Sequence, residues 1–334
     1  MPRVAAPCKP ADQLTELLRP LQADLARVTR RLTESLHDPI AQRVVSLVTS
    51  GGKQLRPSLI LLAGGSQQDD AVRDALIDVA SAAELIHTAT LIHDDIIDRA
   101  IVRRQQPTFH QQFGTERAVL MGDYLYATAF TLIATLRHAG VTSIMAQVCQ
   151  QMSRGELLEV ENRYNMELTQ PQYLEIVRDK TASLIASCCR LGAIVGGASS
   201  ETVERLGAFG LNFGMAFQIM DDCLDLIGEE RVVGKTLRSD LDKGSLSLPI
   251  IFLLQELPAD ERERFVAPLR TRTQDEAFLA LVAGEARHRG AIEQALAIAQ
   301  QFIHNAMTQL DGQAQIPCAD TFRQLASYTI QRAR

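Results

Sequence analysis

Residues 70–98 read DAVRDALIDVASAAELIHTATLIHDDIID and contain neither glycine nor proline. Apolar residues recur along this stretch with helical spacing, which predicts one helix of about seven to eight turns. The stretch ends in a DDxxD pattern, because Asp94 and Asp95 are followed by Asp98. It therefore favours a fold built on long helices, with an acidic group at the end of one of them.

The same periodicity continues along the rest of the chain, and no convincing alternating pattern predicts a strand. The 334 residues are 46% hydrophobic but only 5% aromatic, which suits helix-on-helix packing. We therefore predict an all-α fold, a single large bundle of about ten or more helices over residues 1–334. Other helices are expected at 11–36, 39–49, 115–138, 142–163, 171–196 and 201–227, with three or four more after Pro249.

Composition excludes several classes of protein. The net charge is −6 and no long Lys/Arg run is present, so nucleic acid is not an expected partner. The six cysteines show no CxxC pattern, which is typical of reduced thiols in the cytoplasm. The first ten residues lack the apolar core of a secretory signal, and charges interrupt the apolar segments, so no membrane span is expected. The expected location is the cytoplasm, with peripheral attachment to a membrane as the alternative.

A second acidic triplet ends the helix predicted at 201–227, where Asp221, Asp222 and Asp225 repeat the DDxxD pattern. Residues i and i+4 lie about 40° apart around a helix, so the outer aspartates of each triplet share a face. Anions are unfavourable near a helix C-terminus. A bound cation would offset the repulsion between the carboxylates in both arrangements. Oxygen ligands without a nearby His/Cys set indicate Mg²⁺ as that cation.

A single DDxxD is more often a solvated acidic face of a helix than a metal site. Here both copies directly follow strongly apolar turns, at Ala89 to Ile92 and at Met215 to Met220. Acidic residues in such positions face the rim of a cleft or core. The second copy therefore favours a functional interpretation of both.

Basic residues that suit phosphate groups occur near these patterns, although each taken alone reads as a surface cation. Lys53 and Arg56 lie in the glycine-led stretch GGKQLRP, and Arg103 and Arg104 follow the first triplet. His87 lies two turns before Asp94 on the same predicted face. Two further lysines, Lys180 and Lys235, complete this candidate set.

These motifs resemble the trans-isoprenyl diphosphate synthase (polyprenyl synthetase) family, most closely its long-chain, octaprenyl-type members. The resemblance rests on GGKQLRP, ELIHTATLIHDDIIDRAIVRR, KTA at 180–182 and FQIMDDCLDLIG, and it extends over nearly the whole chain. It implies a helical bundle of the isoprenoid synthase type around a central cavity. It also implies a Mg²⁺-dependent prenyltransferase that condenses isopentenyl diphosphate head to tail with an allylic diphosphate.

The resemblance assigns roles by position. Up to three Mg²⁺ ions would be held by Asp94, Asp98, Asp221 and Asp225, which with Lys180 and Lys235 form the implied catalytic set. The allylic diphosphate would be bound by Arg103, Lys180, Thr181, Gln218 and Lys235, and isopentenyl diphosphate by Lys53, Arg56, His87 and Arg104. Two places depart from the family pattern: Gln105 replaces a usual glycine, and Ser245 stands where a lysine often follows Gly244. The nearby Lys243 is an open candidate for the missing charge.

The resemblance also implies a product length, because bulky aromatic residues five and four positions before the first motif stop growth in the family. Here these positions hold Ala89 and Thr90. Small residues favour a long product of C35 to C45, with C40 as the centre, for a quinone side chain. The floor of the product tunnel is expected from a neighbouring helix near residues 144–148. The product would then pass to a membrane enzyme.

Other interpretations remain. A short-chain synthase making C15 or C20 products uses the same chemistry. A terpene cyclase shares the first DDxxD but commonly lacks the second and the GGKxxR stretch. A non-catalytic subunit of a heteromeric synthase would be expected to have lost aspartates or diphosphate-binding cations. The extensive apolar helix faces make a homodimer the expected assembly.

Overall fold

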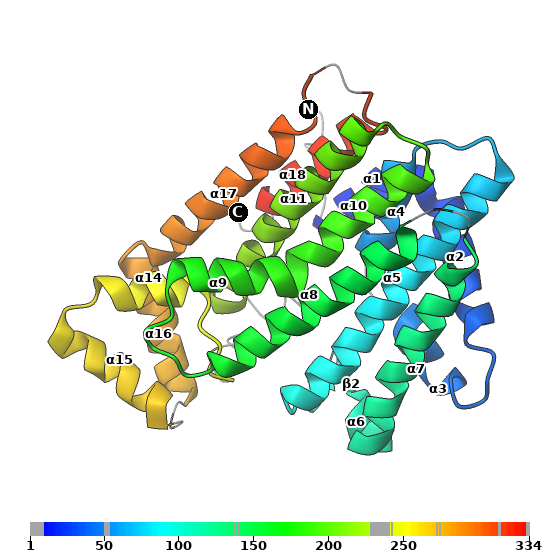
Figure 1. The fold of residues 1–334 in the computed structure, drawn as a ribbon. Coiled ribbons are helices and arrows are strands. Elements are labelled where there is room, and N and C mark those ends of the chain that lie inside the picture. The colour runs from blue at the N-terminus through cyan, green and yellow to red at the C-terminus, as the bar shows by residue number, and fades with distance from the viewer. Residues whose placement is uncertain are drawn as a thin grey trace, which may run out of the picture.

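A computed structural model of the chain describes residues 10–49, 54–103, 105–136, 138, 140–227, 241, 243–271, 273, 275–312 and 315–331. Within these ranges the chain is overwhelmingly helical, which confirms the all-α prediction (Figure 1). The N-terminal half contains α1 (Pro10–Leu17), α2 (Gln22–Ser35), α3 (Gln42–Thr49), α4 (Leu55–Gly64), α5 (Asp70–Ile97), α6 (Phe109–Phe113), α7 (Thr115–Ala134) and α8 (Val141–Glu161). The remainder contains α9 (Gln170–Val177), α10 (Ser183–Val195), α11 (Ser200–Ile227), α14 (Leu248–Glu256), α15 (Ala259–Thr271), α16 (Glu276–His288), α17 (Ala291–Thr308) and α18 (Ala319–Gln331).

Long helices pack side by side through the middle of the molecule (Figure 1). Helix α5 packs against α4 and α7, while α10 packs between α4 and α11. Helix α17 covers another side of α11. This order brings the acidic ends of α5 and α11 to the same region of the bundle, with α8 and α9 beside them.

Helix α5 is the core element that its sequence predicts. Its N-cap Asp69 accepts a hydrogen bond from the Ala71 amide, and its last residue, Ile97, directly precedes Asp98. The expectation that no segment approaches membrane-spanning length was wrong for α5. Among the residues that the structure describes, α5 alone is long and apolar enough, and 78% of its apolar window is buried inside the bundle. The apolar length therefore serves packing against neighbouring helices.

Two helices predicted as continuous are interrupted. The stretch 11–36 divides into α1, a 3-10 turn (Arg19–Leu21) and α2, because Pro20 lacks the amide that would continue the helix. The stretch 171–196 divides into α9, a π turn (Arg178–Ala182) and α10. This second interruption lies at the predicted site residues Lys180 and Thr181, and π turns are frequent at functional positions.

A two-residue antiparallel pair, β1 (Val102–Arg103) and β2 (Gln106–Pro107), occupies the loop after α5, where no strand was predicted. Gln105 lies in the turn between them with φ of 62°. A positive φ favours glycine, so the backbone conformation explains why a glycine suits this place. Glutamine adopts the same conformation here at some cost in local strain.

Buried apolar side chains from Leu14 in α1 to Tyr328 in α18 belong to one contiguous cluster. From Leu248 onward the structure describes five helices, α14 to α18, one more than the upper expectation. The extent of a single domain over the full chain stays a prediction.

Candidate active site

The two acidic triplets lie at the ends of α5 and α11. In the first triplet Asp95 is buried, while Asp94 and Asp98 are half-buried. In the second, Asp222 and Asp225 are buried and Asp221 is half-buried. Neither triplet is the solvated acidic face that the competing interpretation requires, because all six carboxylates are buried or half-buried. Each of them loses part of its hydration, which partners must replace.

Asp98 is held by two cations that come from elsewhere in the chain. Arg163, just beyond α8, donates from Nη2 to Oδ1 of Asp98, and the Nζ of Lys243 lies 2.9 Å from Oδ2. Asp95 points to a different partner, since it accepts a hydrogen bond of 2.8 Å from Nε of Arg103. Arg103, a predicted diphosphate ligand, is thus engaged with a carboxylate in this structure.

Lys180 is surrounded by carboxylates. Its Nζ pairs with Glu159 and lies 2.7 Å from Oε2 of Glu156. Burial alone works to lower the pKa of Lys180, but the attraction of Glu159, Asp94 and Glu156 outweighs it and raises the pKa. The lysine therefore stays charged, and it holds together acidic groups that would otherwise repel one another.

Asp94 belongs to this cluster. Burial is the main reason that its pKa is raised to about 7; Lys180 opposes the rise and the neighbouring carboxylates add to it. Burial likewise raises the pKa of Glu156. An acid with a pKa this close to neutrality is a mark of a functional position when it also lies beside a cavity.

A chain of hydrogen bonds joins the π turn to α11. Thr181 Oγ1 donates to Oε1 of Gln218 at 2.9 Å, and Nε2 of Gln218 donates to Oδ1 of Asp222 at 2.7 Å. The hydroxyl of Tyr173 in α9 donates to the other oxygen of Asp222 at 2.5 Å. Two predicted site residues, Thr181 and Gln218, are therefore fixed in one network with the middle aspartate of the second triplet.

A cavity of about 130 Å³ lies where these elements meet. Four predicted site residues line it, namely Asp98, Lys180, Thr181 and Gln218, together with Glu159, Tyr173, Asp222, Lys243 and Ser245, which were not assigned a role in it. Asp94, Asp221 and Asp225 do not line this cavity. Its walls carry carboxylate, amide, hydroxyl and ammonium groups, which suit an anionic ligand that arrives with a cation.

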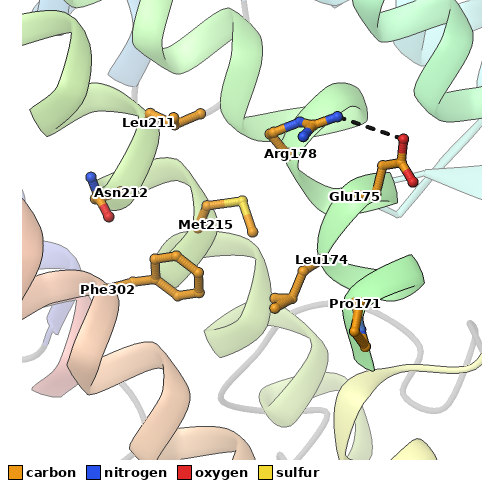
Figure 2. A pocket seen from close by; sticks show the side chains of 8 residues that line it. All are labelled: Pro171, Leu174, Glu175, Arg178, Leu211, Asn212, Met215 and Phe302. Atoms are coloured by element: carbon orange, nitrogen blue, oxygen red, sulfur yellow. Dashed lines mark ion pairs between the residues drawn. The ribbon is translucent and has the colours of Figure 1, made fainter. Parts of the chain in front are cut away.

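A larger hollow of about 570 Å³ lies between α9, α11 and α17 (Figure 2). Leu174, Met215 and Phe302 face it, and its charged residues, Arg178 and Glu175, pair with each other. No residue of either acidic triplet lines it. The smaller cavity is the better candidate for the chemistry because Asp98, Lys180 and Lys243 line it.

The π turn is supported from behind by charged residues. The buried carboxylate of Asp179 accepts a hydrogen bond of 2.8 Å from Nε of Arg178 and pairs with Arg154 of α8. Gly155 lets the turn approach α8 closely, because a Cβ at Gly155 would lie 2.3 Å from the Lys180 backbone nitrogen. These contacts fix the backbone position from which the Lys180 side chain extends.

Replacing Gly155 by alanine is expected to lower the free energy of unfolding by about 2 kcal/mol through overpacking. Gly284, inside α16, is the matched control because a Cβ there meets nothing within 4 Å. Gly284→Ala should raise stability by about 0.5–1 kcal/mol, as expected for a helix interior. Chemical denaturation followed by circular dichroism measures both. Equal effects at the two positions would contradict the close packing of the π turn on α8.

The remaining predicted residues lie on other parts of the fold or outside the described residues. Ala89 is fully buried, and Thr90 is half-buried with its hydroxyl donating to the His87 carbonyl at 2.7 Å. Arg56 lies in the first turn of α4 and acts electrostatically on Cys188, as does Glu84 of α5. Lys53, Arg104 and Lys235 lie outside the described residues.

The donor set can be tested against Mg²⁺. It offers oxygen ligands, and Oε1 of the buried Glu156 accepts no hydrogen bond from the described residues. Over the same residues, no group of three or more His, Cys, Asp or Glu side chains is already gathered in a liganding arrangement. The chemistry of Asp94 and Asp98 fits a hard divalent cation, and at Asp98 that cation would compete with Arg163 and Lys243.

The raised pKa of Asp94 predicts a pH dependence of metal binding. Its folded pKa of about 7 exceeds the ordinary value of 3.8, so without metal its contribution to stability is present below about pH 4 and lost as pH rises through 7. Ionised Asp94 binds metal, so the gain in melting temperature caused by Mg²⁺ should be larger at about pH 8 than at about pH 5.5. Thermal unfolding with and without MgCl₂ measures it. An equal gain at both pH values would contradict Asp94 as a ligand.

Several residues of this site were missed from the sequence. Glu156 and Glu159 lie three apart in α8 and bring a second pair of carboxylates to Lys180. The spacing in GELLEVE was a usable signal, since it places both on one face of the predicted helix 142–163. Arg163, Tyr173 and Asp179 carried no pattern that distinguishes them from surface residues.

The bundle and its cavity define a class of protein: an all-helical scaffold whose cavity is lined by carboxylates, amides, hydroxyls and cations. The model of the family described as "Polyprenyl synthetase" matches residues 37–283. The chain belongs to the polyprenyl synthetase family, and it is a prenyltransferase. The resemblance drawn from the motifs is confirmed.

Individual relatives cover almost the whole chain. The heptaprenyl diphosphate synthase component 2 of Geobacillus stearothermophilus is 36% identical over 93% of this chain and 97% of its own length. The short chain isoprenyl diphosphate synthase of Methanothermobacter thermautotrophicus is 32% identical over 90% and 94%. A solved polyprenyl synthase from Caulobacter crescentus, complexed with calcium and isoprenyl diphosphate, superposes with a TM-score of 0.89 at 30% identity, covering 98% of this chain and 99% of that one.

Proposed function

We propose that this trans-prenyl diphosphate synthase makes a long all-trans product, C35 to C45 with C40 favoured, from isopentenyl diphosphate and an allylic primer. The observation that carries this proposal is the side-chain composition of α5 before its aspartates. The helix contains no Phe, Tyr or Trp from Asp70 to Ile97, and the positions four and five residues before Asp94 hold Thr90 and Ala89. A side of small residues leaves room for a growing chain. We further propose a quinone side chain as the destination of the product.

Sequence similarity supports the prenyl transfer reaction but does not determine the chain length of the product. The two relatives named above carry the names of a heptaprenyl synthase component and of a short-chain synthase, at 36% and 32% identity. Their difference is too small to decide between C15–C20 and C35–C45 products. The proposal therefore depends on the side chains of α5.

The residues of the cavity have distinct proposed tasks. Lys180, Thr181 and Gln218 orient the allylic diphosphate, and the network through Asp222 and Tyr173 keeps the amide of Gln218 in place. Asp94 and Asp98, with Asp221 and Asp225 on α11, are the proposed ligands of Mg²⁺. When bound, Mg²⁺ supplies positive charge that stabilises the departing diphosphate. Arg56 and His87 hold isopentenyl diphosphate, together with Lys53 and Arg104.

These tasks support a three-part reaction. The allylic C–O bond breaks, and its electron pair leaves with the diphosphate, whose charge Lys180 helps to stabilise. The double bond of isopentenyl diphosphate forms the new C–C bond, and a proton is then lost to the released diphosphate. Exclusion of water protects the cationic carbon from hydrolysis, and the buried surroundings of Asp95 and Asp222 are consistent with a dry site.

Replacing Thr90 by phenylalanine is expected to shorten the product to about C15–C20, because the added ring would block the proposed path of the growing chain beside Asp94. Thr90 is the better position for this test, since Ala89 is fully buried and a ring there would overpack the core. Thr33→Phe on the exposed face of α2 is the matched control. Products are sized by chromatography after dephosphorylation. An unchanged product from Thr90→Phe would remove Thr90 from the wall of the path.

A homodimer is the assembly we propose. Leu120, Val119 and Tyr124 of α7 are exposed at 67%, 41% and 37%, which leaves an apolar face for a partner helix. The relative from Geobacillus stearothermophilus is called component 2 of its synthase, which favours keeping a heteromeric assembly as the second candidate. The retained aspartates and Lys180 argue for a catalytic chain in either assembly.

A further inference from the structure

Both carboxylate oxygens of Asp98 are already engaged by cations. Arg163 donates to Oδ1, and the Nζ of Lys243 lies 2.9 Å from Oδ2. The three side chains are only 20%, 27% and 15% exposed for Arg163, Lys243 and Asp98, so water competes weakly for these pairs. Each oxygen of Asp98 therefore already accepts from one cation, and a metal ion has to use the remaining lone pairs. A metal ion at Asp98 also has to compete with two positive charges for the same carboxylate.

The two cations come from segments that are fastened to each other. The Tyr164 amide, next to Arg163, donates a hydrogen bond of 2.8 Å to the carbonyl of Gly244, next to Lys243. Gly244 has φ of 81°, and a Cβ there would lie 2.5 Å from the Tyr164 ring. One backbone contact therefore places both cations, and it allows them to act on the same carboxylate.

Lysine usage sets Lys243 apart from the other charges of this chain. The sequence contains 29 arginines but only five lysines. Three of these, Lys53, Lys180 and Lys235, belong to the predicted site set, and Lys243 lines the cavity. Only Lys9 lies elsewhere. The chain uses arginine for nearly all its other cations, so a lysine in the cavity indicates a need for a compact charge on a flexible stem.

We propose that Arg163 and Lys243 are substrate-positioning residues that exchange partners: they neutralise Asp98 before metal binds, and they contact the allylic diphosphate afterwards. This inference rests on the proposed function. A divalent ion at Asp98 replaces the charge that the two cations supplied. Lys243 lines the cavity, and Arg163 contacts Asp98, which also lines it. Both cations are then released where an incoming diphosphate needs positive charge.

The exchange predicts that replacing Arg163 or Lys243 strengthens metal binding but weakens diphosphate binding. Removing either cation removes a competitor of the metal but also removes a contact to the diphosphate. A residue that only supports the fold would weaken both steps together. A residue without a role would change neither.

The test uses the purified full-length protein and its variants Arg163→Gln and Lys243→Gln. Arg190→Gln is the matched control, because Arg190 pairs with Glu204 on the surface between α10 and α11. Calorimetric titration with Mn²⁺ alone should show binding about three- to tenfold tighter in both site variants than in the parent protein. Titration with inorganic pyrophosphate at saturating Mg²⁺ should show binding at least about tenfold weaker. The control should match the parent in both titrations.

Unchanged or weaker Mn²⁺ binding in both site variants would overturn the exchange, and so would unchanged pyrophosphate binding. Arg163→Lys keeps the charge and therefore separates the effect of charge from a folding defect. Its Mn²⁺ affinity should return towards that of the parent protein. The proposed function fails separately, by absence of elongation in the parent protein. The opposite shifts in the two titrations do not depend on that assay.

Discussion

Replacing Asp94 by alanine is expected to lower the rate of chain elongation by about a thousandfold or more. Asp94 lies in the last turns of α5, beside Lys180 and the glutamates of α8, and it is a proposed ligand of the ion that stabilises the leaving diphosphate. Steady-state kinetics with labelled isopentenyl diphosphate measures the change.

The stability of the Asp94→Ala variant should not fall. Because burial raises the pKa of Asp94 to about 7, its ionised form is unfavourable in the folded protein above that pH. Alanine removes this cost, so the metal-free variant should unfold at an equal or higher temperature at about pH 8. The control Asp74→Ala removes an exposed carboxylate of the same helix and should change the rate little. A near-normal rate for Asp94→Ala would contradict the metal assignment.

Replacing Lys180 by alanine is expected to lower both activity and stability. The lysine neutralises Glu156 and Glu159 within a half-buried cluster, and losing such a charged partner costs about 1–3 kcal/mol. Elongation should fall by at least about a hundredfold, because a cation that contacts the diphosphate is also lost. Thermal unfolding and steady-state kinetics measure the two effects.

Lys180→Arg separates these effects. Arginine keeps the charge and should recover most of the stability, but its planar fork does not reproduce the geometry of an ammonium group, so activity should recover only in part. The opposite changes in stability for Asp94→Ala and Lys180→Ala follow from one electrostatic cluster. Equal changes of the same sign would contradict the arrangement described above.

The sequence was sufficient for the elements whose pattern is local. Helix α5 follows from a stretch without glycine or proline, and its observed end at Ile97 is one residue from the predicted one. Both acidic triplets lie at helix ends as expected. Lys180, Thr181, Gln218 and Asp98 line one cavity, and their roles in it stay a prediction.

The other features depend on contacts between distant segments. The π turn (Arg178–Ala182) forms where the backbone packs on Gly155, and neither fact is visible in the periodicity of 171–196. Arg163 and Lys243 meet at Asp98 because two loops are hydrogen-bonded to each other. Arg103 pairs with Asp95, although its position suggested a diphosphate ligand. Pairings of this kind follow from the tertiary fold and not from spacing.

The central claim is that this chain alone builds a long all-trans polyprenyl diphosphate. Its most direct test supplies the purified protein with Mg²⁺, isopentenyl diphosphate and a farnesyl or geranyl primer, and sizes the dephosphorylated products by chromatography. We predict Mg²⁺-dependent products of C35 to C45 with C40 dominant. A C15 or C20 end product would contradict the proposed length, and no elongation without a second subunit would contradict the claim that the chain acts alone.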